Sequence, residues 1–263
     1  MAGGRTEVVG IWRYPVKSLQ GERLDVAVVE HDGLEGDRRW GIRDGRTGRI
    51  LTARRRPELL HAAASYRDGR PVIVLPDDRV AEGPGPRTDL LLSEWLGSPV
   101  SLVGSHEGPP GRAEFFEDST DDTSRPIEWT MPEGRYVDAA PLLVLATASL
   151  RTAAALHPNG SWEPRRFRPN LLVDHPGEGW PEDGWIGRGL EVGTAVLTPV
   201  EGCIRCTMVT REQPGIEADR DVFRVLARHH GARFGMWCGV AVPGSVALWD
   251  EVAVRVDDPA TTV

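Results

Sequence analysis

Short strand-like segments separated by glycine and proline recur along this chain, and they constrain its fold more than any other feature. Residues 23–30 and 190–199 alternate apolar and polar side chains, as half-buried strands do. Helical patterns are few and are limited to residues 90–96, 147–156 and 221–230. We therefore expect a mainly β protein with some α (α+β), built from β-barrels and not from a doubly wound sheet.

The chain is expected to contain two β-rich domains, since its 263 residues suit one large domain or two small ones. Residues 104–134 carry several prolines, glycines and acidic residues and show no period of 2 or 3.6. We predict a smaller N-terminal β-rich domain over 1–104, a linker or insertion loop over 105–134, and a β-barrel domain over 135–258. An ordered surface insertion is the alternative for the middle segment.

Three local expectations concern the surroundings of possible sites. Residues 39–43 and 49–53 flank a glycine-containing loop, which predicts a hairpin. Residues 207–210 are expected to form a strand. Thr147 is the expected N-cap of the helix that begins there.

The charge and hydropathy of the chain exclude several classes of function. Its net charge of -8 argues against a general nucleic-acid role, although local basic clusters can still bind a small anion. No stretch approaches the roughly 20 apolar residues that span a bilayer. The first ten residues also lack the apolar run of a signal peptide. We expect a cytoplasmic protein without a membrane partner.

The small numbers of cysteine and lysine residues limit the kinds of site that the chain can form. Three cysteines are too few for a disulfide scaffold, and too few for a plant-type iron–sulfur cluster, which takes four. Lys17 is the one lysine among 31 basic residues. It marks either a place that requires a compact ammonium or a chance survival in an arginine-biased chain.

The segment Cys203-Ile204-Arg205-Cys206 has several possible uses. A zinc site would need further ligands, and the remaining cysteine and the pair His229-His230 are poorly spaced for it. A thioredoxin-type redox pair should open a helix, whereas a strand is expected here. One thiolate could instead serve as a soft ligand or nucleophile, which Arg205 would favour. Two buried structural cysteines remain an alternative.

Basic residues gather in three further places. Residues 165–170 bring three arginines and Asn170 to the entrance of a strand, where guanidinium groups can bind phosphate and the amide suits the edge of a heterocycle. Residues 14–18 place Lys17 beside Ser18, and residues 36–40 add Arg38. A solvated basic surface is the alternative for the first of these segments.

Taken in order, these segments resemble the MOSC superfamily with its N-terminal β-barrel domain. The likeness is greatest to the mitochondrial amidoxime-reducing component and its bacterial relatives. It covers nearly the whole chain except residues 104–134, and the matching stretches are 14–18, 36–40, 52–54, 138–142, 148–150, 166–170 and 203–206.

The resemblance implies a molybdenum cofactor of the molybdopterin type between the two domains. It places the metal ligand and the catalytic role on Cys206. It implies cofactor-binding roles near the pterin and its phosphate for Lys17, Ser18, Arg38, Ser149, Arg168, Asn170 and Arg205. Cations suit an anionic pterin phosphate, and a thiolate is a soft ligand that molybdenum can use. The implied reaction is the two-electron reduction of small N-hydroxylated compounds such as amidoximes and hydroxylamines.

The membrane-anchoring N-terminus and the C-terminal ferredoxin-like domain of some relatives have no counterpart in this sequence. We therefore expect a separate electron-donor protein that carries flavin, haem or iron–sulfur. Two other functions stay open. MOSC sequences also occur at the end of molybdenum-cofactor sulfurases, so the chain could be a carrier of the cofactor or of sulfur, with a persulfide on Cys206. It could also be a binding module that has lost the cofactor.

Overall fold

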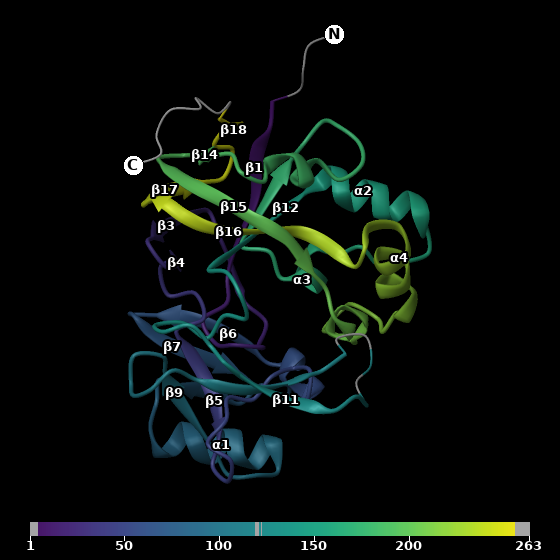
Figure 1. Ribbon diagram of the computed structural model, residues 1–263. Helices are drawn as coiled ribbons and strands as arrows, with labels where there is room; N and C mark the ends of the chain where they lie inside the picture. The colour runs from purple at the N-terminus through teal and green to yellow at the C-terminus, as the bar shows by residue number, and fades with distance from the viewer. Residues whose placement is uncertain (1–4, 119–120, 122, 256–263) are drawn as a thin grey trace.

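The computed structural model describes residues 5–118, 121 and 123–255. Strands dominate it, which confirms a mainly β fold with some α. The helices are short and lie outside the sheets, as Figure 1 shows. They are the α-helices α1 (Pro86–Leu96), α2 (Thr147–Leu156), α3 (Pro164–Phe167) and α4 (Arg220–His230), and the 3-10 helices η1 (Pro57–His61), η2 (Pro181–Trp185) and η3 (Thr207–Thr210).

The largest sheet joins the two ends of the chain. Its strand order is β18-β14-β15-β16-β12-β13-β1-β2. The bounds are β1 (Glu7–Arg13), β2 (Glu22–Leu24), β12 (Leu142–Ala146), β13 (Leu171–Asp174), β14 (Leu190–Val192), β15 (Ala195–Ile204), β16 (Arg233–Val242) and β18 (Val252–Val254). The N-terminal strand β1 runs antiparallel to β13 and pairs Ile11 with Leu171. Its apolar residues therefore enter the same core as Val144, Leu197 and Met236.

A smaller sheet strengthens this connection. It pairs β17 (Gly244–Ala247) with β3 (Val26–Glu30), which pairs in turn with β4 (Gly33–Leu34). The single strand expected over residues 23–30 is therefore wrong: the chain breaks between β2 and β3, which bind different neighbours. Residues 7–34 thus share sheets and a core with the C-terminal half. The domain boundary at residue 104 stays a proposal drawn from the sequence.

The other half of the molecule has its own core around Leu59, Ile73 and Leu92. Its strands are β5 (Trp40–Asp44), β6 (Ala63–Arg67), β7 (Arg70–Val74), β8 (Val80–Glu82) and β9 (Val100–Gly104). The hairpin expected from residues 39–43 and 49–53 forms only in part. β5 pairs along its length with β9, while Arg43 bridges Ile50 and the Leu51 amide donates to the Ile42 carbonyl at 2.8 Å. The Ile50 amide donates to the Arg112 carbonyl at 2.7 Å.

Within residues 105–134 the structure contains a β-hairpin. It consists of β10 (Arg112–Phe116) and β11 (Pro126–Thr130), paired antiparallel with Phe115 opposite Ile127. The Phe115 and Trp129 rings lie 6.2 Å apart. The ordered insertion, which the sequence left as an alternative, describes these residues better than a linker.

Two local expectations are also wrong, one about the start of a helix and one about a strand. Ala146, not Thr147, is the N-cap of α2, because the Thr147 hydroxyl donates to Asp174 at 2.6 Å and is not available to the helix. Residues 207–210 form η3 in place of the expected strand.

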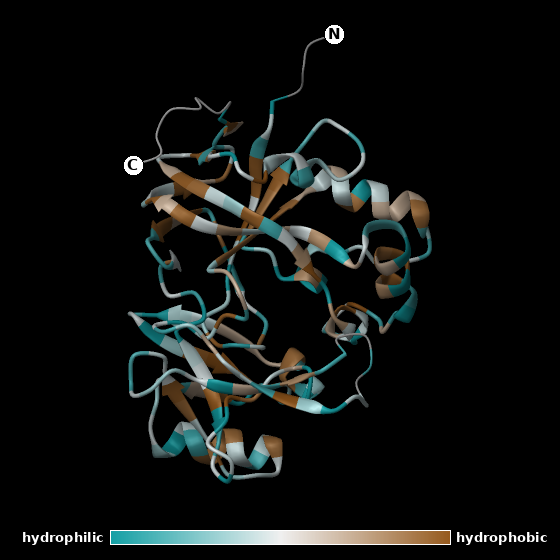
Figure 2. Ribbon diagram, in the orientation of Figure 1, coloured by the Kyte–Doolittle hydropathy of each residue, from teal (hydrophilic) through white to brown (hydrophobic). Residues whose placement is uncertain are grey.

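Figure 2 shows hydrophobic residues concentrated on the strands of the largest sheet. No helix in the described ranges has the length and apolar character needed to cross a bilayer.

Candidate functional site

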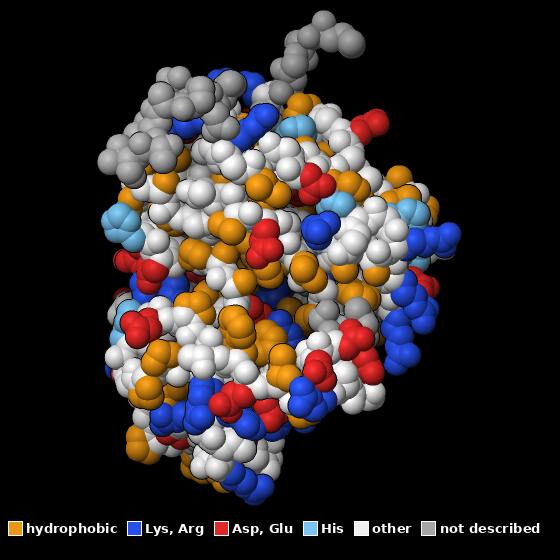
Figure 3. Space-filling view, in the orientation of Figure 1, with side chains coloured by type: hydrophobic (Ala, Val, Ile, Leu, Met, Phe, Trp, Pro, Cys, Tyr) orange, Lys and Arg blue, Asp and Glu red, His pale blue; other side chains and the backbone are white. Residues whose placement is uncertain are grey.

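A cavity of about 330 Å³ lies where loops from both halves of the molecule meet. Figure 3 shows a hollow between the halves, bordered by hydrophobic side chains and with basic side chains visible inside it. Seven of the eight residues that the sequence singled out line this cavity: Lys17, Ser18, Arg38, Arg168, Asn170, Arg205 and Cys206. They come from four separate stretches of sequence, which the fold brings together at one cavity.

The guanidinium groups of Arg38 and Arg168 both contact the ring of Tyr14. Their guanidinium carbons are 4.9 Å and 4.3 Å from the centre of the Tyr14 ring. Burial lowers the pKa of Arg168 to about 10, so the group stays charged at neutral pH. Burial also opposes the charge on Arg38, but the Asp37 carboxylate and other neighbours outweigh it and raise the pKa of that guanidinium. Two permanent cations are therefore held in the cavity wall.

Lys17 is fixed at the same cavity by two acceptors. Its ammonium donates to the Tyr136 carbonyl at 2.9 Å and to Asp138 at 2.5 Å. Arg54 donates to the other oxygen of Asp138 at 2.8 Å. Burial alone would raise the pKa of Asp138, but the two cations hold it well below its usual range. Asp138 therefore joins Lys17 and Arg54 while it remains ionised.

One hydroxyl in the cavity wall has no partner. Thr52 is 3% exposed, lines the cavity, and its Oγ1 makes no hydrogen bond within the described part of the chain. A buried polar atom without a partner costs roughly 1–3 kcal/mol. Such an atom at a cavity surface fits a bound polar group. Nearby, the Ser18 hydroxyl accepts the Ala53 amide at 3.0 Å, with Ser18 in the left-handed region at φ 70°.

Asn170 is engaged by the protein itself. Its Oδ1 accepts from Arg38 at 3.2 Å and from the Leu143 amide at 3.1 Å, and its Nδ2 donates to the Trp12 carbonyl at 3.2 Å. These bonds tie the entrance of β13 to β1 and orient the guanidinium of Arg38. The expected contact with the edge of a heterocycle would have to share atoms that already have partners.

Burial separates the two cysteines of the C-x-x-C segment. Cys203 is 5% exposed, and its sulfur accepts from Arg205 at 2.9 Å, while the same guanidinium donates to the Phe167 carbonyl at 2.6 Å. Burial raises the pKa of the Cys203 thiol, with Arg205 acting in the opposite direction. Cys206 is half-buried and lies beside Arg54, where a thiolate would raise the pKa of that guanidinium.

The two other readings of the segment can be compared with this geometry. The residues after Cys206 form a four-residue 3-10 turn, not the long helix that a thioredoxin-type pair opens. Within the described ranges, no three His, Cys, Asp or Glu side chains gather closely enough to hold a metal ion. The described residues therefore form neither the helix start of a thioredoxin-type pair nor the ligand cluster of a zinc site.

Two basic or polar residues from the predicted segments lie away from the cavity lining. Ser149 is buried in α2, where its hydroxyl donates to the Glu182 carboxylate. Burial raises the pKa of Glu182, which also accepts the Ala146 amide at 2.8 Å. Arg166 is fully buried and donates to the carbonyls of Val209 at 2.8 Å and Glu217 at 2.7 Å. Both side chains therefore stabilise the fold around the site.

Several lining residues were not singled out from the sequence. Arg54 and Asp138 belong to matched stretches, but nothing in the local pattern shows that they bind each other across 84 positions. The aromatic residues Phe115, Phe116 and Trp129 lie in the segment that was expected to be a loop. The one signal available was in β11, where Ile127 and Trp129 alternate with other residue types.

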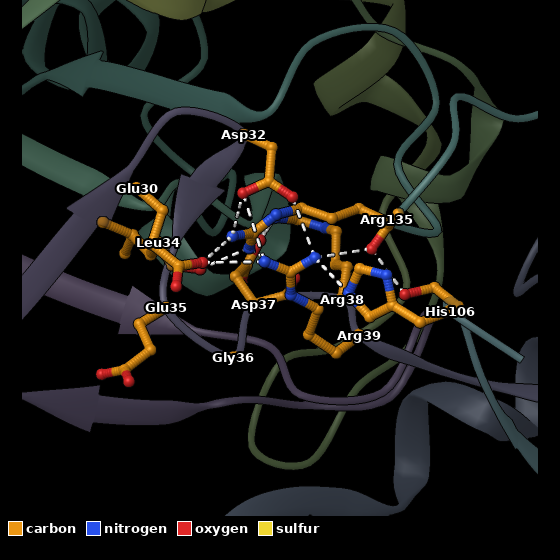
Figure 4. Close-up of polar contacts among 12 residues, drawn as sticks. Glu30, Asp32, Leu34, Glu35, Gly36, Asp37, Arg38, Arg39, His106 and Arg135 are labelled. Atoms are coloured by element: carbon orange, nitrogen blue, oxygen red, sulfur yellow. Dashed lines mark hydrogen bonds and ion pairs between the residues drawn. The ribbon is translucent and has the colours of Figure 1, made fainter. Parts of the chain in front are cut away.

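Arg135 supports the loop that presents Arg38. It is 1% exposed and donates to the carbonyls of Leu34 and Asp37, the latter at 2.8 Å. It also binds Glu30 at 2.7 Å and Asp32 at 2.8 Å, as Figure 4 shows. Arg39 binds the same two carboxylates from the other side.

We expect the Arg135→Ala substitution to lower the free energy of unfolding by about 3 kcal/mol, because it leaves buried carbonyls and paired carboxylates without their donor. Urea unfolding measures this change. Arg224→Ala removes an exposed arginine paired with Asp221 and should cost no more than about 0.5 kcal/mol. Equal stabilities of the two variants would contradict a structural role for Arg135.

Two domain families match the chain. Residues 5–89 match the MOSC N-terminal beta barrel domain, and residues 132–261 match the MOSC domain. Together the two matches span most of the chain, and the unmatched part includes α1's end, β9 and the β10–β11 hairpin.

Three curated relatives show low identity over long alignments. Mitochondrial amidoxime-reducing component 1 of Mus musculus is 24% identical over 93% of this chain and 81% of its own length. Mitochondrial amidoxime reducing component 2 of Bos taurus is 24% identical over 76% and 65%, respectively. Molybdenum cofactor sulfurase of Oryza sativa subsp. japonica is 25% identical over 76% of this chain, which spans only 28% of that protein.

Among solved structures, the YUAD protein from Bacillus subtilis superposes with a TM-score of 0.46 at 14% identity, and the match covers 95% of this chain and 94% of that one. The domain assignment rests on the sequence matches alone. Both domains occur in the order that the sequence motifs predicted. The chain therefore belongs to the MOSC family and combines an N-terminal MOSC β-barrel domain with a MOSC domain.

Proposed function

We propose that the cavity binds a molybdenum cofactor of the molybdopterin type and that the protein is a molybdenum-dependent oxidoreductase that reduces N-hydroxylated compounds. One observation carries the proposal: the cavity concentrates positive charge in a chain whose net charge is -8. Among its described lining residues, five are Lys or Arg and one is Asp. The relatives named as amidoxime-reducing components support the reaction class.

The residues present fit an anionic cofactor. Arg38 and Arg168 offer planar donors that match phosphate oxygens, and Lys17 adds a compact charge. The Thr52 hydroxyl, which has no partner among the described residues, can bond to a further polar atom of the ligand. Cys206 offers a sulfur ligand at the same cavity.

The chain's own residues position this chemistry. When bound, the cofactor would supply the two-electron transfer that removes oxygen from an N–OH group. Cys206 would hold the metal, with the positive charge of Arg54 beside its sulfur. Asp138 keeps Arg54 and Lys17 in fixed positions. Arg205 binds Cys203 and the Phe167 carbonyl, and so fixes the turn that presents Cys206. Electrons would come from a separate protein that carries flavin, haem or iron–sulfur.

A second candidate is a carrier of the cofactor or of sulfur as a Cys206 persulfide. The identity to the rice sulfurase, over 76% of this chain, favours it. A reduced-dye assay with benzamidoxime distinguishes the two functions. Turnover supports the oxidoreductase, and absence of turnover in protein with a full cofactor load supports the carrier.

We expect protein produced in a cofactor-making host to contain about one molybdenum and one pterin per chain, because the cationic cavity and the thiol occur together. Metal analysis and pterin fluorescence after oxidation measure both. Metal-free and pterin-free protein, from a host that loads a control molybdoenzyme, would contradict the proposal.

A further inference from the structure

A second cavity of about 190 Å³ adjoins the first. Six residues line both cavities: Arg54, Phe115, Phe116, Ile204, Cys206 and Trp237. Cys206 therefore borders both spaces. A small molecule that reaches the Cys206 sulfur from the first cavity has the second cavity open beside it.

The second cavity shares its aromatic wall with the first but lacks most of the charged residues of the first. Phe115 and Phe116 come from β10, Trp237 comes from β16, and Ile204 ends β15. Among the described residues that line it, Arg54 is the one charged side chain. That guanidinium donates to Asp138 and lies 4.0 Å from the centre of the Phe115 ring.

The two cavities differ in positive charge, and they therefore suit different kinds of ligand. The cations Lys17, Arg38 and Arg168 line the first cavity and not the second. An anionic cofactor is therefore held by the first cavity, while the second offers aromatic faces and edges for a flat apolar ring. No carboxylate lines the second cavity in the described part of the chain, and Arg54 would repel a cationic substituent there.

We propose that the second cavity binds the ring of neutral aromatic substrates, and that Phe116 and Trp237 determine this specificity. The proposal rests on the proposed function and narrows its substrate class to uncharged N-hydroxylated compounds that carry an apolar ring. The ring lies between β10 and β16, and the N–OH group reaches the cofactor held by Cys206. The hairpin between the two matched domains thereby contributes to substrate choice.

The first test measures binding without turnover. Benzamide carries a neutral ring and no N–OH group, and acetamide lacks the ring. Calorimetry on the holoprotein should show benzamide binding roughly 10- to 100-fold more tightly, as expected for burial of a phenyl ring. The Phe116→Ala variant should lose about 3- to 10-fold of the benzamide affinity. Glu128→Gln changes an exposed charge on the neighbouring strand and should leave it unaltered.

The second test compares two substrates. Phe116→Ala should raise KM for benzamidoxime and leave the KM for hydroxylamine unchanged, since hydroxylamine has no ring to place. Trp237→Leu is measured beside it, because Phe116 is buried and its loss could impair folding. Failure of the wild type to reduce either compound counts against the proposed function, and the benzamide measurement still decides on the cavity. Equal affinities for benzamide and acetamide, or unchanged benzamide binding in both folded variants, would overturn the inference.

Discussion

The Cys206→Ser variant is expected to lose reduction of N-hydroxylated substrates, whereas Cys203→Ser should retain substantial activity. Cys206 is half-buried and borders both cavities. A serine there replaces a soft anionic ligand with a neutral hydroxyl. Cys203 is buried at the end of β15, where its sulfur accepts a hydrogen bond from Arg205, so its loss should affect packing more than chemistry.

Activity is measured together with molybdenum and pterin contents in both variants. Pterin should remain in Cys206→Ser, because its phosphate contacts come from other residues. Cys238→Ala serves as a control for thiol loss, since Cys238 is fully buried in the core of the largest sheet. An inactive Cys203→Ser and an active Cys206→Ser would reverse the ligand assignment. Full activity and metal load in both would rule out thiolate-ligated molybdenum.

The sequence alone could not show which of the two cysteines, Cys203 or Cys206, is the more buried. An extended C-x-x-C segment puts its two cysteines on opposite faces, but it does not say which face is buried. The answer depends on Arg205, which reaches both Cys203 and the carbonyl of Phe167, 38 positions away. That contact exists only after the end of β15 and the end of α3 have come together.

Several residues that the sequence singled out lie in short motifs and line the cavity. Lys17, Arg38, Arg168 and Cys206 all reach the cavity, and each belongs to a stretch that resembles the family. Ser149 belongs to such a stretch too, yet its side chain is taken by Glu182. A motif indicates that a segment is near a site, whereas the partner of each side chain is set by distant parts of the chain.

Strand partners were the hardest feature of the fold to predict. Alternation identified several strands, but it carries no information about which strands pair. β5 binds β9 across a gap of more than fifty positions, and β1 binds β13 across a larger one. The hairpin β10–β11 was missed for another reason: all five residues of β11 are exposed, so the strand shows no buried apolar face.

Replacement of Arg168 by alanine should weaken cofactor retention more than replacement of Arg165. Arg168 lines the cavity at 6% exposure, and burial has already removed much of the water from its guanidinium. A charge-assisted hydrogen bond contributes on the order of 1.5–3 kcal/mol, which corresponds to a loss of affinity of roughly 10- to 150-fold. Arg165 lies in α3, the short helix whose C-cap is Arg168, but it is more exposed, pairs with Glu163 and lies outside the cavity lining.

Retention is measured as the pterin remaining after dialysis, with urea unfolding of each variant in parallel. The parallel measurement matters because Arg168 also donates to the Leu19 carbonyl at 2.7 Å and contacts the Tyr14 ring. A variant that unfolds at the wild-type urea concentration and still loses pterin locates the effect in binding, because a folding defect would move the urea midpoint as well. Equal pterin retention in Arg165→Ala and Arg168→Ala would remove Arg168 from the cofactor site and leave Arg38 and Lys17 as the cations that hold the phosphate.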